Sequence, residues 1–338
     1  MKLIRLNERL DKIYHASDKI LFQEYFLKKK NFLNYSNEIR KNYKKNNFIN
    51  SISKIQYILN FLKKDKFHKI VDLKNIIDVK EENINFVTFR CDVDAGVWSL
   101  EKMSKLFNKY NLSVYFYILI NSYYYGQLFK NNIERNTFFF KNYLSKLKNE
   151  NQKVGIHNDI YGLIKSGHNG VRFLKQEINW LNKKNYNIIS SSAHNSAYVY
   201  GAENFQIFKE FSNPINKKFF LKNYNIKTGI ISQKNLGLRF EANFPEIDLK
   251  KKELRKYFKK RNDPIRNKLW LKNHFLQNPI YTSRYDVDIW VTGKNSWFIA
   301  DRKGKKIYLN KNINEIINFL KFEKGKKIVV NLHPDYFE

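Results

Sequence analysis

The sequence predicts an α/β fold built on a mainly parallel sheet or barrel. From residue 85 onward, short segments rich in aromatic and β-branched residues alternate with segments whose apolar residues recur at helical spacing. Such alternation implies right-handed crossovers between parallel strands. Polar residues suited to chemistry follow several of the strand segments, which is where ligands and catalytic groups collect in folds of this kind.

The elements are expected in a regular order. A strand over residues 85–90 leads into a helix over residues 99–110, for which Ser99 is the expected N-cap. The next expected elements are strands at residues 113–121, 153–157 and 187–194 and helices at residues 136–149 and 170–184. The pattern then weakens, with a helix near residues 203–211, strands near 227–231 and 237–242, and a charged helix over 248–260. The chain is expected to regain order at 280–286, to pass a Gly/Asn turn at 293–295, and to end with a helix at 313–322 and a strand at 327–332.

The composition limits the choice of partners. The chain has 338 residues, enough for a full core, and a formal net charge of +32. Such a charge favours polyanionic partners, but the excess is mostly Lys spread along the whole length, without a compact basic motif. We therefore expect no specific nucleic-acid partner and keep peripheral contact with an anionic membrane as an expectation.

Two parts are expected. Residues 1–84 are depleted in Gly and Pro and rich in Lys, and Ile55, Leu59 and Leu62 recur at helical spacing, which predicts an N-terminal helical extension. Residues 85–338 form the main domain. The single cysteine, Cys91, cannot form an internal disulfide, and the first residues lack the apolar core of a secretion signal. We expect a cytoplasmic protein, with a peripheral place at the inner membrane face as a further expectation.

Four stretches place metal-competent groups at the ends of predicted strands. Any one of these stretches alone would be weak evidence of a functional site, because a lone His or Asp in a loop usually caps a helix or hydrogen-bonds to the backbone. Together they favour a functional site, since the ends of parallel strands converge in space. The stretches are Asp92 with Asp94, His157 with Asp159, His194 with Asn195, and His333.

These residue types suit metal-assisted hydrolysis. A carboxylate and two imidazoles form a good ligand set for Zn²⁺ or a similar divalent ion with an open position for water. A second carboxylate can take a proton from the water, and a separate His can protonate a leaving group. Because one residue separates Asp92 from Asp94, both side chains are expected on the same side of an extended chain.

The ordered motifs resemble a known family. Arg-Cys-Asp-Val-Asp at residues 90–94, Gly-Ile-His at 155–157, Ala-His-Asn-Ser at 193–196 and Leu-His-Pro at 332–334 resemble the polysaccharide deacetylase-like proteins of the NodB-homology group, related to carbohydrate esterase family 4. The resemblance covers about residues 85–338 and points to members linked to surface-polysaccharide assembly. It implies an irregular (β/α)7 barrel and metal-dependent removal of an acetyl group from an N-acetylated sugar.

The resemblance also implies roles for individual residues. Asp92 matches the family's catalytic base, and Asp94 matches its metal-binding aspartate. His157 matches the first metal-binding histidine, and His333 fits the late histidine that acts as general acid. The expected cofactor is a divalent ion, Zn²⁺ first and other divalent transition metals after it.

The sequence departs from the family pattern in two places. Tyr161 stands where the family has its second histidine, and either His194 or Asp159 is a candidate to replace that ligand. The usual Arg-x-Pro pattern near the fourth strand is missing as well. Weaker expected contacts with a carbohydrate substrate come from Asp159, Tyr161, Asn195, Arg284 and Asp286.

Two alternatives to a deacetylase stay open. Asp-Val-Asp after a strand also resembles the Asp-x-Asp signature of metal-dependent glycosyltransferases, although such enzymes have no evident need for the motifs around His157 and His333. A catalytically inactive, deacetylase-like protein that binds glycans through its positive surface is the third hypothesis.

Overall fold

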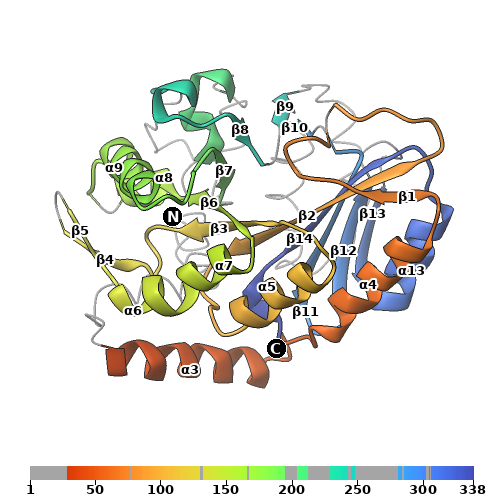
Figure 1. Cartoon of the computed structure of the whole chain (residues 1–338), viewed down its shortest axis with the longest axis horizontal. Helices are drawn as coiled ribbons and strands as arrows, with labels where there is room; N and C mark the ends of the chain where they lie inside the picture. Colours follow the sequence, from red (N-terminus) through yellow and green to blue (C-terminus); the bar gives the residue numbers. More distant parts are fainter. Residues whose placement is uncertain are drawn as a thin grey trace, which may run out of the picture.

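The computed structural model has a mixed α/β fold with a mostly parallel central sheet and helices against it (Figure 1). The residues described are 29–76, 78–129, 132–165, 167–194, 204–211, 229–242, 245–247, 281–283, 285–301, 304 and 306–338. The charged helix expected over residues 248–260 lies outside these residues, as do residues 227 and 228 of the strand expected at 227–231. In the rest of that segment only Ile231 has a β-pairing, an isolated bridge with Phe208.

The central sheet contains ten strands in the described part of the chain. In spatial order they are β13 (Lys306–Lys311), β12 (Ser296–Asp301), β11 (Val287–Gly293), β14 (Lys327–Leu332), β2 (Asn85–Val93), β3 (Tyr115–Leu119), β6 (Lys153–Asn158), β7 (Ser190–Ala193) and β8 (Phe240–Glu241), with β1 (His68–Ile70) also paired to β2. All neighbours from β11 to β8 pair in parallel, whereas β11, β12 and β13 are antiparallel. No pairing between β8 and β13 closes the described strands into a barrel.

Strand β2 lies at the centre of the sheet and is buried along its whole length. β14 pairs with one edge of β2 over Phe86–Cys91. The opposite edge is shared, because β1 pairs with its first residues, Asn85–Val87, and β3 with its last, Arg90–Val93. The boundary expected at residue 84 therefore runs between two paired strands.

The two faces of β2 have different surroundings. Val87, Phe89 and Cys91 belong to the large hydrophobic cluster that the helices complete. Phe86 belongs to a smaller cluster, with Tyr115 and Tyr117 of β3, on the other face. Side chains alternate along a strand, so Arg90 and Asp92 lie on this second face, and Asp92 and Asp94 share a side as the spacing predicts.

The helices pack mainly against the first face. The longer ones are α3 (Lys29–Lys45), α4 (Ser53–Lys64), α5 (Leu100–Lys109), α9 (Gly170–Lys183) and α13 (Ile313–Phe322), with the short α8 (Ile160–Lys165) before α9. Ile55, Leu59 and Leu62 of α4 are buried, as their spacing predicts, and they join the same cluster as the sheet. Among the described residues, no helix is both long and apolar enough to span a membrane.

Two expected helices are less regular than predicted. The segment expected at residues 136–149 consists of α6 (Thr137–Phe139), a π-helical segment (Phe140–Leu144) and α7 (Ser145–Asn149). The segment expected at residues 203–211 forms two 3₁₀ turns, Asn204–Ile207 and Lys209–Phe211. Two small antiparallel pairs complete the fold, β4 (Gly126–Leu128) with β5 (Ile133–Arg135) and β9 (Pro245–Ile247) with β10 (Tyr281–Ser283).

The loop after β2 is fastened to the segment after β14. Asp335 accepts hydrogen bonds from the backbone N–H groups of Ala95 (3.0 Å) and Gly96 (2.6 Å). A Cβ at Gly96 would lie 2.5 Å from the Asp335 Cα, so this approach requires glycine. Ser99 is the N-cap residue of α5, as expected, but its hydroxyl donates to the Pro334 carbonyl (2.6 Å) and makes no capping hydrogen bond. These contacts hold the loops that carry Asp94 and His333 side by side.

Candidate metal centre

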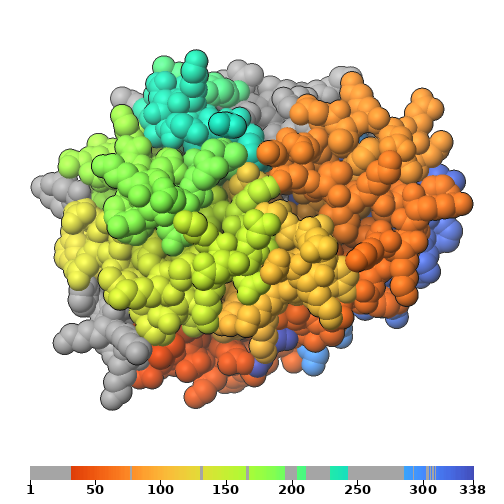
Figure 2. All heavy atoms as spheres, in the orientation of Figure 1, coloured from red at the N-terminus to blue at the C-terminus, as the bar shows by residue number. Residues whose placement is uncertain are grey.

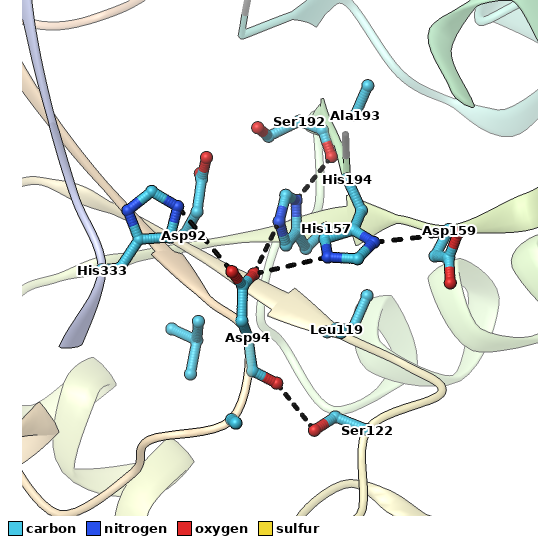
Figure 3. Close-up of polar contacts among 12 residues, drawn as sticks. Asp92, Asp94, Leu119, Ser122, His157, Asp159, Ser192, Ala193, His194 and His333 are labelled. Atoms are coloured by element: carbon cyan, nitrogen blue, oxygen red, sulfur yellow. Dashed lines mark hydrogen bonds and ion pairs between the residues drawn. The ribbon is translucent and has the colours of Figure 1, made fainter. Parts of the chain in front are cut away.

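The carboxyl ends of four parallel strands bring the main predicted site residues together (Figure 3). Asp92 lies near the end of β2 and Asp94 follows it. His157 lies in β6, His194 follows β7, and His333 follows β14. Five side chains that are far apart in the sequence thus lie close together at the carboxyl end of the sheet.

Asp94, His157 and His194 form a triad that can hold a metal ion. Each offers one ligand atom, and the three atoms lie within 4.8 Å of one another. His157 Nε2 is 3.0 Å from Asp94 Oδ1, and His194 Nε2 is 4.0 Å from the same oxygen. Tyr161 stands where the family has its second histidine ligand, and His194 and Asp159 are the candidates to replace it. Of these two, His194, which follows the next strand, belongs to the triad.

A hydrogen bond at Nδ1 fixes the orientation of the His157 ring. Its Nδ1 lies 2.8 Å from the carbonyl oxygen of Ser192, an acceptor, so Nδ1 carries a proton. In the neutral ring, Nε2 then directs its lone pair at Asp94 Oδ1. Two acceptors 3.0 Å apart repel each other unless a cation or a proton lies between them.

His194 is supported by Asp159 and Asn204. Its Nδ1 lies 3.8 Å from Asp159 Oδ1. The Asn204 amide donates to both the His194 carbonyl (2.7 Å) and Asp159 Oδ1 (3.0 Å), while Asn121 donates to Asp159 Oδ2 (2.7 Å). Asp159, expected as an alternative ligand or a substrate contact, is buried behind His194, and its carboxylate lies within ion-pair distance of that imidazole.

Asp92 is buried in a cationic setting. Arg90 Nη2 lies 3.2 Å from Asp92 Oδ2, and the Asn331 amide donates to the same oxygen at 3.1 Å. Burial alone would raise the pKa of the Asp92 carboxyl, but Arg90 and the nearby His157 hold that pKa below its usual value. Asp92 is therefore ionised near neutral pH, and its Oδ1 has no hydrogen-bond partner among the described residues.

Asp94 and His333 face each other across 3.8 Å, from Oδ2 to Nε2. Burial alone would raise the pKa of Asp94, but the contact with His157 and the charges that His333 and His194 carry when they are protonated lower it. Burial lowers the pKa of His333, and Asp94 and Asp92 offset this only in part. Near pH 7 Asp94 is thus a carboxylate and His333 a neutral imidazole, available to accept a proton.

Comparisons with models of protein families, with curated proteins and with solved structures found no match to this chain. The motifs and the geometry that they produce therefore carry the functional argument.

The weaker predicted site residues do not all reach this cluster. Tyr161, on α8, packs in the large hydrophobic cluster, and its backbone N–H donates to Asn204 Oδ1 (2.8 Å). Asp286 lies at the opposite end of β14, where its carboxylate accepts the backbone N–H of Lys327 (2.9 Å). This place corrects the expected substrate contact from Asp286. Asn195 and Arg284 lie outside the described residues.

Sequence reasoning gave no role to Arg90, Asn331, Asn121 or Asn204. The first two could have been predicted from their spacing. Arg90 lies two residues before Asp92, and Asn331 lies two residues before His333, so each pair shares one face of its strand. Asn204 lies in a 3₁₀ turn far along the chain from Asp159, and no local pattern marks it.

Proposed function

We propose that the chain is a metal-dependent deacetylase that hydrolyses the acetamido group of an N-acetylated sugar or glycan precursor in surface-polysaccharide biosynthesis. One observation carries the proposal. A carboxylate and two imidazoles offer ligand atoms within 4.8 Å, beside the ionised Asp92 and the imidazole of His333. The sugar substrate rests on the order of the motifs, which resembles the polysaccharide deacetylase-like family.

The irregular (β/α)7 barrel belongs to the same proposal. The parallel run contains seven strands, namely β11, β14, β2, β3, β6, β7 and β8. A seven-stranded parallel run with helices on its outer face and a polar cluster at its carboxyl end supports a barrel in which the site lies at the usual rim.

The donor set of the triad fits Zn²⁺. Catalytic zinc sites use three protein ligands of the His and carboxylate type and leave a further position open. His157 Nδ1 is hydrogen-bonded to the Ser192 carbonyl, as is usual for imidazoles that bind zinc, and the Asp159 carboxylate lies 3.8 Å from Nδ1 of His194. An ion bound there would supply Lewis acidity toward the amide carbonyl and lower the pKa of a water.

The remaining groups account for the proton transfers. Hydrolysis adds water across the amide C–N bond, which releases acetate and leaves an amine on the sugar. Asp92, kept ionised by Arg90, accepts a proton from the attacking water. That bond breaks only if the leaving nitrogen gains a proton. His333, neutral before the reaction, takes up a proton from solvent and delivers it to that nitrogen, and Asp92 afterwards returns its proton to solvent. Figure 3 shows Asp92 and His333 on the same side of Asp94.

The test separates metal binding from catalysis. We expect Asp94→Ala and His157→Ala each to abolish zinc binding, measured by calorimetry on protein stripped of metal. Asp92→Asn and His333→Gln should retain the metal but lose amine release from N-acetylglucosamine oligomers by about 100-fold or more. Asp78→Asn, at an exposed position, is the control and should change neither quantity.

Three outcomes would contradict the proposal. Undiminished metal binding by Asp94→Ala would remove the site. Metal binding without hydrolysis of any N-acetylated sugar would favour the inactive glycan-binding protein. Metal-dependent binding of a nucleotide-sugar, with no deacetylation, would favour the glycosyltransferase.

A further inference from the structure

A surface far from the metal centre combines exposed aromatic rings with lysines. Phe322, the last residue of α13, is 84% exposed, and Phe67, between α4 and β1, is 40% exposed. Exposed lysines lie in the same two segments of the chain, residues 63–67 and 321–324. The lysine–phenylalanine patch consists of Lys63, Lys66, Phe67, Lys321, Phe322 and Lys324.

The patch is one continuous surface because its segments meet at Asn85. The Asn85 backbone N–H donates to the Phe67 carbonyl (2.8 Å), and its side-chain amide donates to the Glu323 carbonyl (2.6 Å). The ammonium groups of Lys66 and Lys324 lie 5.3 and 5.6 Å from the centre of the Phe67 ring. Figure 1 shows α4 and α13 side by side, and in Figure 2 the orange atoms around α4 and β1 adjoin the blue atoms of the last segments.

The lysines of the patch are not neutralised by the carboxylates around them. Glu323 pairs with Lys326, Glu81 pairs with Lys69, and Asp65 accepts the backbone N–H of Phe67 (2.8 Å). Within the part of the chain that the structure describes, none of the four patch lysines has a carboxylate oxygen within 4.0 Å. The patch therefore presents uncompensated positive charge around two apolar rings.

We propose that the lysine–phenylalanine patch docks the protein on an anionic membrane surface. Phenylalanine rings partition into the boundary between lipid headgroups and acyl chains, while nearby ammonium groups contact anionic headgroups. This chemistry suits a ring as exposed as that of Phe322, which lies at the end of a helix and needs no groove. Proteins that hold single-stranded nucleic acid instead line a positively charged groove with stacking aromatics.

The patch and the metal centre lie at opposite ends of the same strands. Asn85 begins β2 and Asp94 follows its end, so the nine residues of β2 separate the two by about 30 Å. Docking through the patch turns the metal centre away from the bilayer. If the proposed function holds, the substrate is then a water-dissolved sugar or precursor.

Vesicle sedimentation tests the proposal with the whole chain. The protein should bind phosphatidylcholine vesicles that contain phosphatidylserine at ~0.15 M salt and should not bind vesicles of phosphatidylcholine alone. Lys321→Ala combined with Lys324→Ala should lower the partition coefficient by about 25-fold, because each lysine near an anionic surface contributes about 5-fold. Phe322→Ser should weaken binding as well.

Matched controls lie elsewhere on the surface. The pair Lys183→Ala and Lys184→Ala at the end of α9 removes the same charge from the opposite edge in Figure 1, and Phe129→Ser removes another ring, 44% exposed. These controls should bind vesicles like the unaltered chain, and all patch variants should keep their zinc affinity. The proposal is wrong if the unaltered chain does not bind anionic vesicles, if the α9 pair weakens binding as much as the patch pair, or if the patch lysines bind an oligonucleotide and not vesicles.

Discussion

Glu177 and Asp94 are both carboxylates enclosed by the fold, and their surroundings differ. Glu177, on α9, is 1% exposed and has donors at both oxygens. Arg135 donates to Oε2 (2.9 Å) and Oε1 (2.6 Å), and the Tyr125 hydroxyl donates to Oε2 (2.6 Å). Asp94 instead faces imidazole nitrogens of His157 and His194, and its Oδ1 has no hydrogen-bond partner among the described residues.

The difference separates a structural carboxylate from a ligand. The protein itself satisfies Glu177, so that network stabilises the fold. At Asp94 the acceptors converge on one another, an arrangement that a cation would satisfy and that folding alone does not require. Removal of Glu177 should therefore cost stability, whereas removal of Asp94 should cost metal binding.

The largest effect on stability is expected at Glu177. Glu177→Ala removes the partner of Arg135 and Tyr125 and should lower the free energy of unfolding by about 3–5 kcal/mol, measured by urea denaturation. Glu134→Gln, a neighbouring exposed carboxylate, is the control and should change it by less than about 0.5 kcal/mol. A loss below about 1 kcal/mol at Glu177 would mean that this network does not anchor α9.

A smaller effect is expected at Arg90. Arg90→Met leaves Asp92 without its cation, which destabilises the fold, but it also removes two buried guanidinium nitrogens that have no partner in the described structure. The two effects partly cancel, so we expect a loss of about 2 kcal/mol in urea denaturation. Zinc binding should persist while deacetylation falls, and loss of zinc binding would show that Arg90 supports the triad as well.

Asp94→Asn should hardly change the stability of protein stripped of metal. The imidazoles that lower the pKa of Asp94 stabilise its carboxylate fully only when they are protonated, and His333 is neutral near pH 7, so the free energy of unfolding should change there by about 1 kcal/mol or less. With zinc present, the unaltered chain should gain stability and the variant should not, because an ion that binds only the folded state stabilises it. A loss of about 3 kcal/mol without metal would place Asp94 with Glu177 as a structural residue.

The smallest effect on the free energy of unfolding is expected at Glu101, an exposed carboxylate. Hydrogen bonds from Lys105 and Lys146 lower the pKa of Glu101 to about 2. A lowered pKa means that this stabilisation is full above the unfolded value of about 4.3 and is lost as the pH falls toward 2. Solvent screens the pairs, so Glu101→Gln should cost less than about 1 kcal/mol at pH 7 and much less than that at pH 2. An equal cost at both pH values would show that the effect is not electrostatic.

The sequence predicted the regular parts of the fold well. The last helix and strand have the expected bounds, Ile313–Phe322 and Lys327–Leu332, because a clear periodicity coincides with the capping box of Asn312 and Glu315. The strand expected at residues 187–194 is only Ser190–Ala193, since Asn187 adopts a left-handed conformation with φ of 50° that ends the extended chain.

The site was predictable where it follows strand periodicity. Asp92, Asp94, His157, His194 and His333 all lie at strand ends, and the sheet brings them together. The supporting residues were harder, because a contact such as that of Asn204 with Asp159 depends on tertiary packing. Asp286 was misplaced for the same reason, since the Asp-Val-Asp at residues 286–288 gives no sign of which strand end it occupies.

The most direct test of the metal centre is zinc binding by His194→Ala, because His194 is the ligand in which this chain departs from the family pattern. Titration of protein stripped of metal should give one zinc ion per chain, and the variant should lose affinity by at least about 100-fold. The control His168→Ala, a histidine outside the cluster, should bind zinc like the unaltered chain. An unchanged affinity in His194→Ala would contradict the account, because the triad would then not be the metal site.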